Sequence, residues 1–164
     1  ALSVNAQLKK GYTENYSLYI GNSFHKQDNF FSINLSYDVL LPYFYDYKFY
    51  GYGLAFSQYS KNNFFIGPEY YFKPLRSYLF RNPHFFHFLS LQGGYCKNQG
   101  ESGIYIRPQL SFLMNASIIL NMNLRFKLGV SYDITSYSDF SISQPGLHLQ
   151  IALGWNQRKN FPED

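Results

Sequence analysis

The sequence predicts an all-β fold, an antiparallel up-and-down transmembrane β-barrel with its apolar face outward. Three observations predict it. Polar and apolar residues alternate along most of the chain, and the alternating segments are as long as membrane-crossing strands. The composition is also rich in aromatic residues, with 17 Tyr and 17 Phe among 164 residues, and only 15% of the residues are charged. A soluble domain usually carries about 25% charged residues.

Membrane crossing by helices is excluded by the hydropathy of the chain. No stretch approaches the ~20 consecutive apolar residues that a transmembrane helix needs, and the mean hydropathy is −0.29. A barrel fits this value, because each strand presents only every second residue to lipid. The length of 164 residues suits one domain, predicted to cover residues 1–164.

The first half of the chain predicts four strands. Residues 16–24 alternate weakly, and residues 31–39 alternate clearly, with Phe31, Ile33 and Leu35 on one face. Residues 50–57 place Tyr50, Tyr52, Leu54 and Phe56 opposite Gly51, Gly53, Ala55 and Ser57, and residues 64–72 form a fourth, weaker segment. Polar turn-rich pieces at 26–29 and 60–63 separate these strands.

The second half predicts four more strands, at residues 85–95, 104–114, 122–134 and 147–155. The clearest is 122–134. One face carries Met122, Leu124, Phe126, Leu128, Val130, Tyr132 and Ile134, and the other carries Asn123, Arg125, Lys127, Gly129, Ser131 and Asp133. In a helix these charges would be spread around the circumference, whereas a strand separates the two sets. Residues 97–100 are expected to form a loop beside Cys96.

The strand count has an alternative. Residues 2–8 form a plausible ninth strand, but single-chain bacterial barrels have even strand numbers. Further strands could come from residues 39–48, which contain Pro42, or from residues 115–121, where three apolar residues in a row interrupt the alternation. Eight strands are predicted and ten are the alternative, with a polar tail at 156–164.

Alternation alone does not decide which face meets lipid, because a soluble lipocalin-like barrel alternates too, with its apolar face inward. The polar face here is rich in small residues such as Gly51, Gly53, Gly129 and Gly154, which suit a narrow interior. It also carries charges of both signs, which would have to pair if buried. The predicted interior polar plug is Asp38, Glu69, Arg107, Arg125, Lys127, Asp133 and His148; a selectivity ring in a channel is the alternative.

The opposite face is predicted to contact lipid. Aromatic residues gather near segment ends, as in the girdles of membrane barrels. The clearest lipid-facing positions are on the last two strands: Leu124, Phe126, Leu128, Val130, Leu149, Ile151, Leu153 and Trp155.

Candidate catalytic residues are sparse. His87 and Ser90 are the weak candidates for a hydrolytic pair, but on a strand residues three apart point to opposite faces. His25 lies beside a turn and is expected to be solvated, and His84 with His87 lacks further ligands at metal-site spacing. No Gly-rich phosphate loop is present, and Cys96 is the single cysteine. The sequence therefore predicts no metal site and no cofactor.

Residues 2–155 resemble the small outer-membrane β-barrel proteins of Gram-negative bacteria in length, alternation and final strand. The apolar last strand ending at Trp155 resembles their assembly signal, although a polar tail follows it here. The opening Leu2-Ser3-Val4-Asn5-Ala6 and the Tyr-ended strands are similar to small Bacteroidota barrels, including conjugal-transfer TraO-type proteins. The resemblance implies the bacterial outer membrane as location, and Ala1 at the start fits a removed signal peptide, although a shortened chain would begin in the same way.

Three functions remain open at this stage. The first is a structural or accessory barrel subunit that is not an enzyme and binds outer-membrane lipid, lipopolysaccharide and a larger outer-membrane protein. The second is an interfacial enzyme that modifies lipid A, and the third is a soluble barrel that binds an apolar ligand. Nucleic acid is not an expected partner, because the basic residues behind the net charge of +4 are scattered along the chain.

Overall fold

A computed structural model describes residues 11–26, 29–43, 46–60, 63–73, 85–119 and 121–160. These residues form eight strands: β1 (Gly11–His25), β2 (Asn29–Tyr43), β3 (Asp46–Ser60), β4 (Asn63–Phe72), β5 (Phe85–Asn98), β6 (Glu101–Ile119), β7 (Met122–Tyr137) and β8 (Ser141–Asn160). Within the described ranges no helix is long and apolar enough to cross a membrane.

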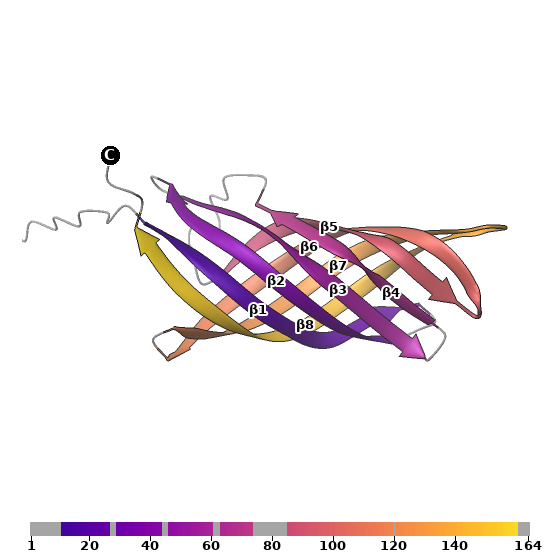
Figure 1. The fold of residues 1–164 in the computed structure, drawn as a ribbon, viewed down its shortest axis with the longest axis horizontal. Coiled ribbons are helices and arrows are strands. Elements are labelled where there is room, and N and C mark those ends of the chain that lie inside the picture. The colour runs from indigo at the N-terminus through magenta and orange to yellow at the C-terminus, as the bar shows by residue number, and fades with distance from the viewer. Residues whose placement is uncertain are drawn as a thin grey trace, which may run out of the picture.

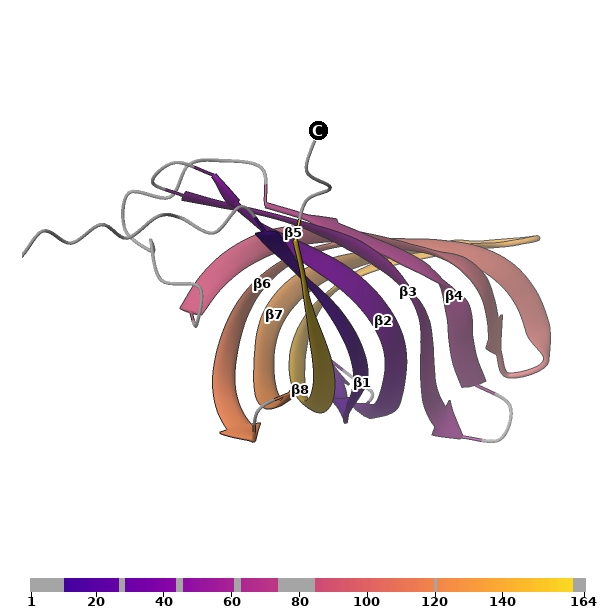
Figure 2. The same cartoon turned by 60° about the vertical axis from the view of Figure 1, so that its left-hand side comes forward.

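The strands close into one barrel in chain order, each antiparallel to its neighbours, and β8 pairs back to β1 (Figures 1 and 2). The predicted all-β, eight-stranded, up-and-down barrel is confirmed, and the alternative of ten strands is wrong. Residues 39–43 complete β2 and residues 46–48 begin β3, while residues 115–119 complete β6, so neither doubtful region adds a strand. The possible ninth strand at 2–8 lies outside the described residues.

The pairing register fixes the geometry of the barrel. Paired residues can be followed from Asn15 on β1 once around the wall, through Asp38, Gly51, Tyr71, Ser90, Gln109, Ser131 and Gly146, to His25, again on β1. The path returns ten residues further along the strand, so the shear is ten for eight strands. This shear corresponds to a strand tilt of roughly 40° and an interior that side chains can fill.

The two ends of the barrel differ in the chain segments that meet there. The terminal end is the one at which Gly11 and Asn160 pair, and the hairpin end is the one at which β7 turns into β8 after Tyr137. Figure 1 shows the end of β8 at the left, at the terminal end, with the hairpins of β5–β6 and β7–β8 at the right.

Most strands are longer than predicted, because pairing continues into the turn regions. The link from β5 to β6 is a two-residue turn in which Gln99 and Gly100 have φ of 49° and 98°. Positive φ at both central residues is the geometry of a tight hairpin turn, and glycine adopts it without strain. Lys97 and Asn98 are therefore strand residues rather than the predicted loop, and Cys96 is buried within β5.

The first five residues of the polar tail predicted at 156–164 belong to β8. Asn156 to Asn160 continue β8 and pair with residues 11–15 of β1. The sequence shows no apolar alternation here, but the neighbouring β1 backbone supplies hydrogen-bond partners regardless of side-chain polarity. Residues 161–164 lie outside the described residues.

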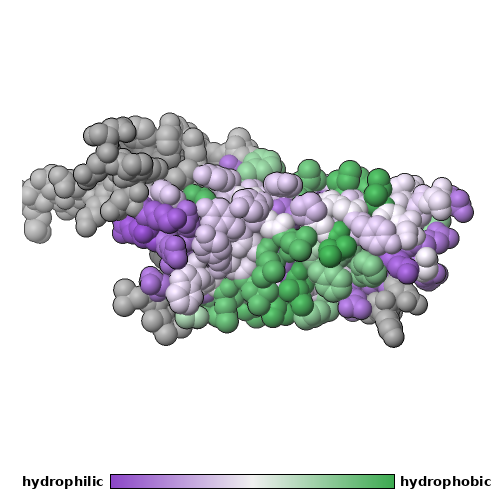
Figure 3. Space-filling model, in the orientation of Figure 1, coloured by the Kyte–Doolittle hydropathy of each residue, from purple (hydrophilic) through white to green (hydrophobic). Residues whose placement is uncertain are grey.

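Burial alternates along the strands as the sequence does. On β7 the residues from Leu128 to Ser136 are alternately exposed and buried. Figure 3 shows apolar residues gathered around the middle of one side of the barrel, with hydrophilic residues toward both ends. The alternation thus sorts each strand into residues that fill the interior and residues that cover the outside.

Candidate functional site

All seven residues predicted for the polar plug lie in the barrel interior, and none is more than 4% exposed: Asp38, Glu69, Arg107, Arg125, Lys127, Asp133 and His148. Arg125, Lys127 and Asp133 project inward from three different levels of β7, so the plug extends along the barrel axis. The three buried cations and three buried anions of this set balance in formal charge.

Within the plug, the ion pair nearest the terminal end joins β7 to β2 across the barrel. Both terminal nitrogens of the Arg125 guanidinium donate to the carboxylate of Asp38, with Nη2 at 3.1 Å from Oδ1. Asn15 Nδ2 donates to the same Oδ1 at 2.8 Å, and Arg125 Nη1 also donates to Ser17 Oγ at 3.0 Å. A buried carboxylate with several donors is compensated for the loss of water.

A second ion pair lies one level further from the terminal end. Lys127 Nζ donates to Glu69 Oε1 at 2.9 Å, and Asn34 Nδ2 donates to Oε2 at 2.8 Å. The Lys127 ammonium also lies over the rings of Tyr19 and Phe88, 5.7 and 5.5 Å from their centroids. Ion pair and aromatic faces together replace the hydration of this ammonium group.

The third cluster lies toward the hairpin end and is centred on Asp133. Arg107 donates to it through two nitrogens, Nε to Oδ1 at 2.8 Å and Nη2 to Oδ2 at 2.7 Å. His25 Nε2 lies 2.8 Å from Oδ2, and the side chain of His25 is fully buried. The expectation that His25 is solvated is therefore wrong, because β1 continues to His25 and turns its side chain inward.

His148 connects this cluster to a chain of hydroxyl groups. Its Nδ1 lies 2.7 Å from Ser23 Oγ and its Nε2 lies 2.7 Å from Ser131 Oγ. Ser131 donates its one proton to Asp133 Oδ1 at 2.8 Å, so it accepts from His148 Nε2. The network therefore assigns the proton of neutral His148 to Nε2. A histidine that donates to a serine does not act as its base, so Ser131 is not an activated nucleophile.

Within the described ranges, His25, Asp133 and His148 place one potential metal-ligand atom each within 4.8 Å of one another. Their chemistry does not fit a metal ion. The Nε2 atoms of His25 and His148 are hydrogen-bond donors in this network, and both oxygens of Asp133 already accept from Arg107. A divalent cation would have to displace this guanidinium or lie against its positive charge.

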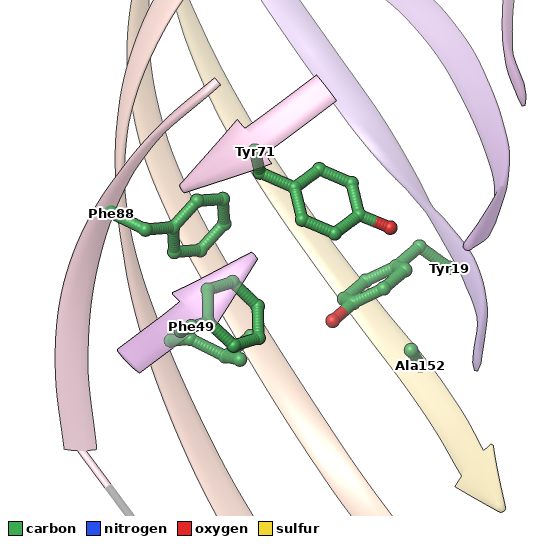
Figure 4. Packing of buried hydrophobic residues seen from close by; sticks show 6 residues of the cluster. Tyr19, Phe49, Tyr71, Phe88 and Ala152 are labelled. Atoms are coloured by element: carbon green, nitrogen blue, oxygen red, sulfur yellow. The ribbon is translucent and has the colours of Figure 1, made fainter. Parts of the chain in front are cut away.

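Aromatic clusters fill the space beside the ion pairs. In one cluster Phe49, Tyr71 and Phe88 pack within 6 Å of one another by ring centroids, next to Tyr19 (Figure 4). Gly51 makes room for Tyr71, because a Cβ there would lie 2.3 Å from its ring. The second cluster is nearer the hairpin end: Phe30, Phe65, Cys96, Tyr105 and Tyr137. Arg107 lies 5.2 Å over the ring of Phe65, so ionic and aromatic groups form one continuous filling.

The weak catalytic candidates are not brought together. Ser90 points inward and is 4% exposed, whereas His87 shares its side of β5 with the exposed Leu89 and Leu91. The ring of His87 lies beside Phe112, with centroids 6.3 Å apart. The two side chains therefore lie on opposite faces of the barrel wall, as their spacing predicts.

The eight positions predicted to contact lipid lie on the outer side of β7 and β8. Leu124 and Phe126 are half-buried. The remaining six are between 45% and 56% exposed: Leu128, Val130, Leu149, Ile151, Leu153 and Trp155. They form neighbouring rows, since Leu128 pairs with Leu149 and Leu124 pairs with Leu153.

No protein-family model matches this chain, and no curated protein or solved structure matches it either. Function is therefore inferred from the geometry of the barrel alone.

Sequence reasoning missed His25 as a member of the site. The signal was present, because Asn15, Ser17, Ser23 and His25 share one side of β1 at period two. The strand was predicted to end at residue 24 because polar turn residues follow, and so the last inward residue was left out.

Proposed function

We propose that this chain is an accessory outer-membrane β-barrel subunit, which spans the bilayer as a closed barrel and binds a larger membrane protein. The observation that carries the proposal is the separation, along β7, of buried charged residues from exposed apolar residues. Arg125, Lys127 and Asp133 are buried in ion pairs, whereas Leu128 and Val130 on the other face are about half exposed. A water-soluble barrel has the reverse arrangement.

The size of the exposed apolar surface supports a lipid environment. Among the described residues, 28 large hydrophobic side chains are more than a third exposed, and all eight strands contribute to them. The largest apolar patch on a soluble monomer is usually a few hundred Å². A wall of this composition would be costly in water and is stable against acyl chains.

The height of this wall also matches a bilayer. The outward apolar residues of β7 extend from Met122 to Ile134. At about 3.3 Å per residue and a tilt of roughly 40°, they cover about 30 Å along the barrel axis. The hydrocarbon core of a bilayer is about 30 Å thick, and the apolar band of outer-membrane barrels is about 25 Å tall.

The filled interior argues against a channel. Ion pairs and aromatic rings occupy the described interior from the Arg125 level to the Arg107 level, and an eight-stranded barrel leaves no further space. In planar bilayers the purified protein should give no steady ion conductance. With a closed interior, the outer wall and the two rims are the surfaces left for function.

The two alternative functions receive less support. A lipid A-modifying enzyme would need a convergent nucleophile and base, and His87 and Ser90 face opposite sides of the wall. A soluble carrier would need an apolar cavity, but a ligand in this interior would have to displace the buried charges.

Extraction of native membranes tests the proposal. We expect the protein to stay in the membrane during salt and carbonate washing, and to be released by mild detergent with one companion in stoichiometric amount, identified by mass spectrometry. Release by carbonate would contradict membrane embedding. A lone monomer in mild detergent would contradict the accessory role.

A further inference from the structure

We propose that an oblique row of aromatic residues on β8 and β1–β4 is the surface that binds the partner, and that the partner is a different outer-membrane protein presenting hydrogen-bond acceptors at bilayer depth. The tyrosine row consists of Trp155, Tyr16, Tyr37, Tyr52 and Tyr70. This inference rests on the proposed function and names the binding surface and the chemistry of the partner.

The tyrosine row is defined by strand register. Trp155 pairs with Tyr16, Tyr16 with Tyr37, Tyr37 with Tyr52, and Tyr52 with Tyr70. In the middle of the row the rings are in contact, with centroids 5.1 Å apart for Tyr16 and Tyr37 and 5.4 Å apart for Tyr37 and Tyr52. Five adjacent strands thus form one aromatic surface.

The shear of the barrel makes this row slope away from the terminal end. Ten residues of shear over eight strands raise a row of paired residues by about 3 Å along the axis per strand. Trp155 lies near the terminal edge of the apolar wall, because the polar Gln157 follows it on the same face. Tyr70, four strands on, is therefore about 12 Å higher, near the middle of an apolar band of about 25 Å.

The hydroxyl groups of Tyr52 and Tyr70 have no partner at this depth. Tyr37 is hydrogen-bonded to Glu14, but in the part of the chain that the structure describes, the hydroxyls of Tyr52 and Tyr70 make no hydrogen bond. Their side chains are 58% and 60% exposed. Acyl chains offer no acceptors, so both hydroxyls would remain unsatisfied in lipid alone.

The other half of the wall does not share this feature. At corresponding depth it presents aliphatic residues, among them Leu128, Leu149 and Ile151. Its exposed tyrosines lie toward the hairpin end, where Tyr95 bonds Ser102 at 2.6 Å and Tyr132 lies one outward position before Ile134. Tyrosine belongs at that level, near lipid headgroups. Unmatched hydroxyls deep in the apolar band are therefore a property of the β3–β4 side.

The outer wall is grooved in two places, one on the side of the tyrosine row and one of about 560 Å³ beside Phe112, Leu128 and Leu149. A groove of about 640 Å³ lies between the tyrosine row and the parallel row of Leu153, Leu18, Leu35 and Leu54. In Figure 3 the near face shows pale, weakly hydrophilic residues beside the apolar ones. Tyr52 lines this groove, so a protein side chain with an apolar stem and an acceptor at its end, such as Gln or Glu, fits both the groove and the Tyr52 hydroxyl.

A second copy of the chain satisfies this surface less well. In a two-fold dimer with its axis along the membrane normal, the sloping rows of the two copies would cross. The hydroxyls of the two copies could then pair only where the rows cross. Either Tyr52 or Tyr70 of each copy would keep an unmatched hydroxyl. This geometry favours a different outer-membrane protein as the partner.

Removing the hydroxyls while keeping the rings tests the inference. The Tyr52→Phe/Tyr70→Phe double variant should weaken retention of the companion about tenfold, equal to about 1.4 kcal/mol, during purification in mild detergent. Tyr132→Phe is the matched control on β7 and should retain the companion like the unmodified chain. All three proteins should show the same heat-modifiable migration, which establishes that the barrels are folded.

Photo-crosslinking in native membranes identifies the occupant. A benzophenone amino acid at position 52 or 70 should crosslink to that companion, and at position 128 or 149 to lipid only. Equal retention by the double variant, crosslinks to lipid alone at 52 and 70, or crosslinks to a second copy would each overturn this inference while leaving the membrane barrel intact. Absence of any companion from the unmodified protein would overturn the proposed function as well.

Discussion

The two faces of β7 show the same strand serving two different surroundings. Inward, Arg125, Lys127 and Asp133 are at most 4% exposed and are matched by partners on β2, β4 and β6. Outward, Leu128 and Ile134 are 45% and 44% exposed and have no such partners across the barrel. The polar side chains of the interior have their partners within the chain. The apolar side chains of the wall depend on the medium around the barrel. Substitutions on the two faces should therefore respond to different conditions.

The largest effect is expected from unpairing a buried charge. Asp38→Ala leaves the Arg125 guanidinium buried without its carboxylate, and removing one partner of a buried pair costs about 3–5 kcal/mol. Urea unfolding in lipid vesicles and in detergent should both show this loss, because the interior does not depend on the medium. Asp139→Ala, at an exposed bend, is the control. Equal stability of the two variants would contradict the buried ion pair.

A charge introduced on the outward face should instead destabilise the barrel only where that face contacts lipid. Leu128→Arg lies in the middle of the apolar stretch of β7 and should cost about 2–4 kcal/mol in lipid vesicles. Ser136→Arg has the same strand and face but lies near the hairpin end, so its cost should be close to zero. Unfolding of both variants in the same vesicles measures the difference. Similar values for the two would contradict a lipid-facing wall.

A smaller effect is expected within the hydroxyl chain of the interior. Ser131→Ala removes the donor to Asp133 Oδ1 and the acceptor of His148 Nε2. Leaving a buried donor unsatisfied costs about 1–3 kcal/mol. Ser143→Ala, at an exposed position of β8, should not change the unfolding midpoint. If Ser131→Ala behaves like Ser143→Ala, Ser131 does not link His148 to Asp133 as described.

The smallest effect is expected at the terminal end, outside the apolar band. Lys159 Nζ lies 2.7 Å from Glu14 Oε2, and its hydrogen bond lowers the pKa of the Glu14 carboxyl. Because the pKa is lower in the folded protein, this pair stabilises the barrel at neutral pH, and the contribution is lost as pH falls through the lowered pKa. Lys159→Ala should therefore lower the unfolding midpoint slightly at pH 7 and not at acid pH. A difference that persists at acid pH would contradict this assignment.

Period-two alternation made most of the fold predictable. It placed all eight strands and, through inward glycines such as Gly51 and Gly129, indicated a narrow interior on the polar face. The inward orientation of Arg125 and Lys127 follows from parity within one strand, which a one-residue shift would reverse. This is why the members of the plug could be named from the sequence.

The partners of those residues could not be predicted. Arg125 pairs with Asp38 at a sequence separation of 87 residues, and Lys127 pairs with Glu69 at a separation of 58. Both choices depend on the shear, which a sequence does not specify without the registers of all eight pairings. His25 was missed for a local reason. Polar turn residues follow it, so the sequence pattern did not show that the strand continues to residue 25. The tyrosine row likewise becomes one surface only through the registers of four strand pairs.

The most direct test of the central claim is the accessibility of spin labels along the outward face of β7 in lipid vesicles. Labels would be attached to cysteines placed one at a time at Leu124, Leu128, Val130 and Ser136, with Cys96 replaced by serine. We predict that collisions with oxygen are most frequent at position 128, that collisions with a water-soluble nickel chelate are rarest there, and that the order reverses toward position 136. A nickel chelate that reaches position 128 as readily as position 136 would show that water, and not lipid, covers the barrel.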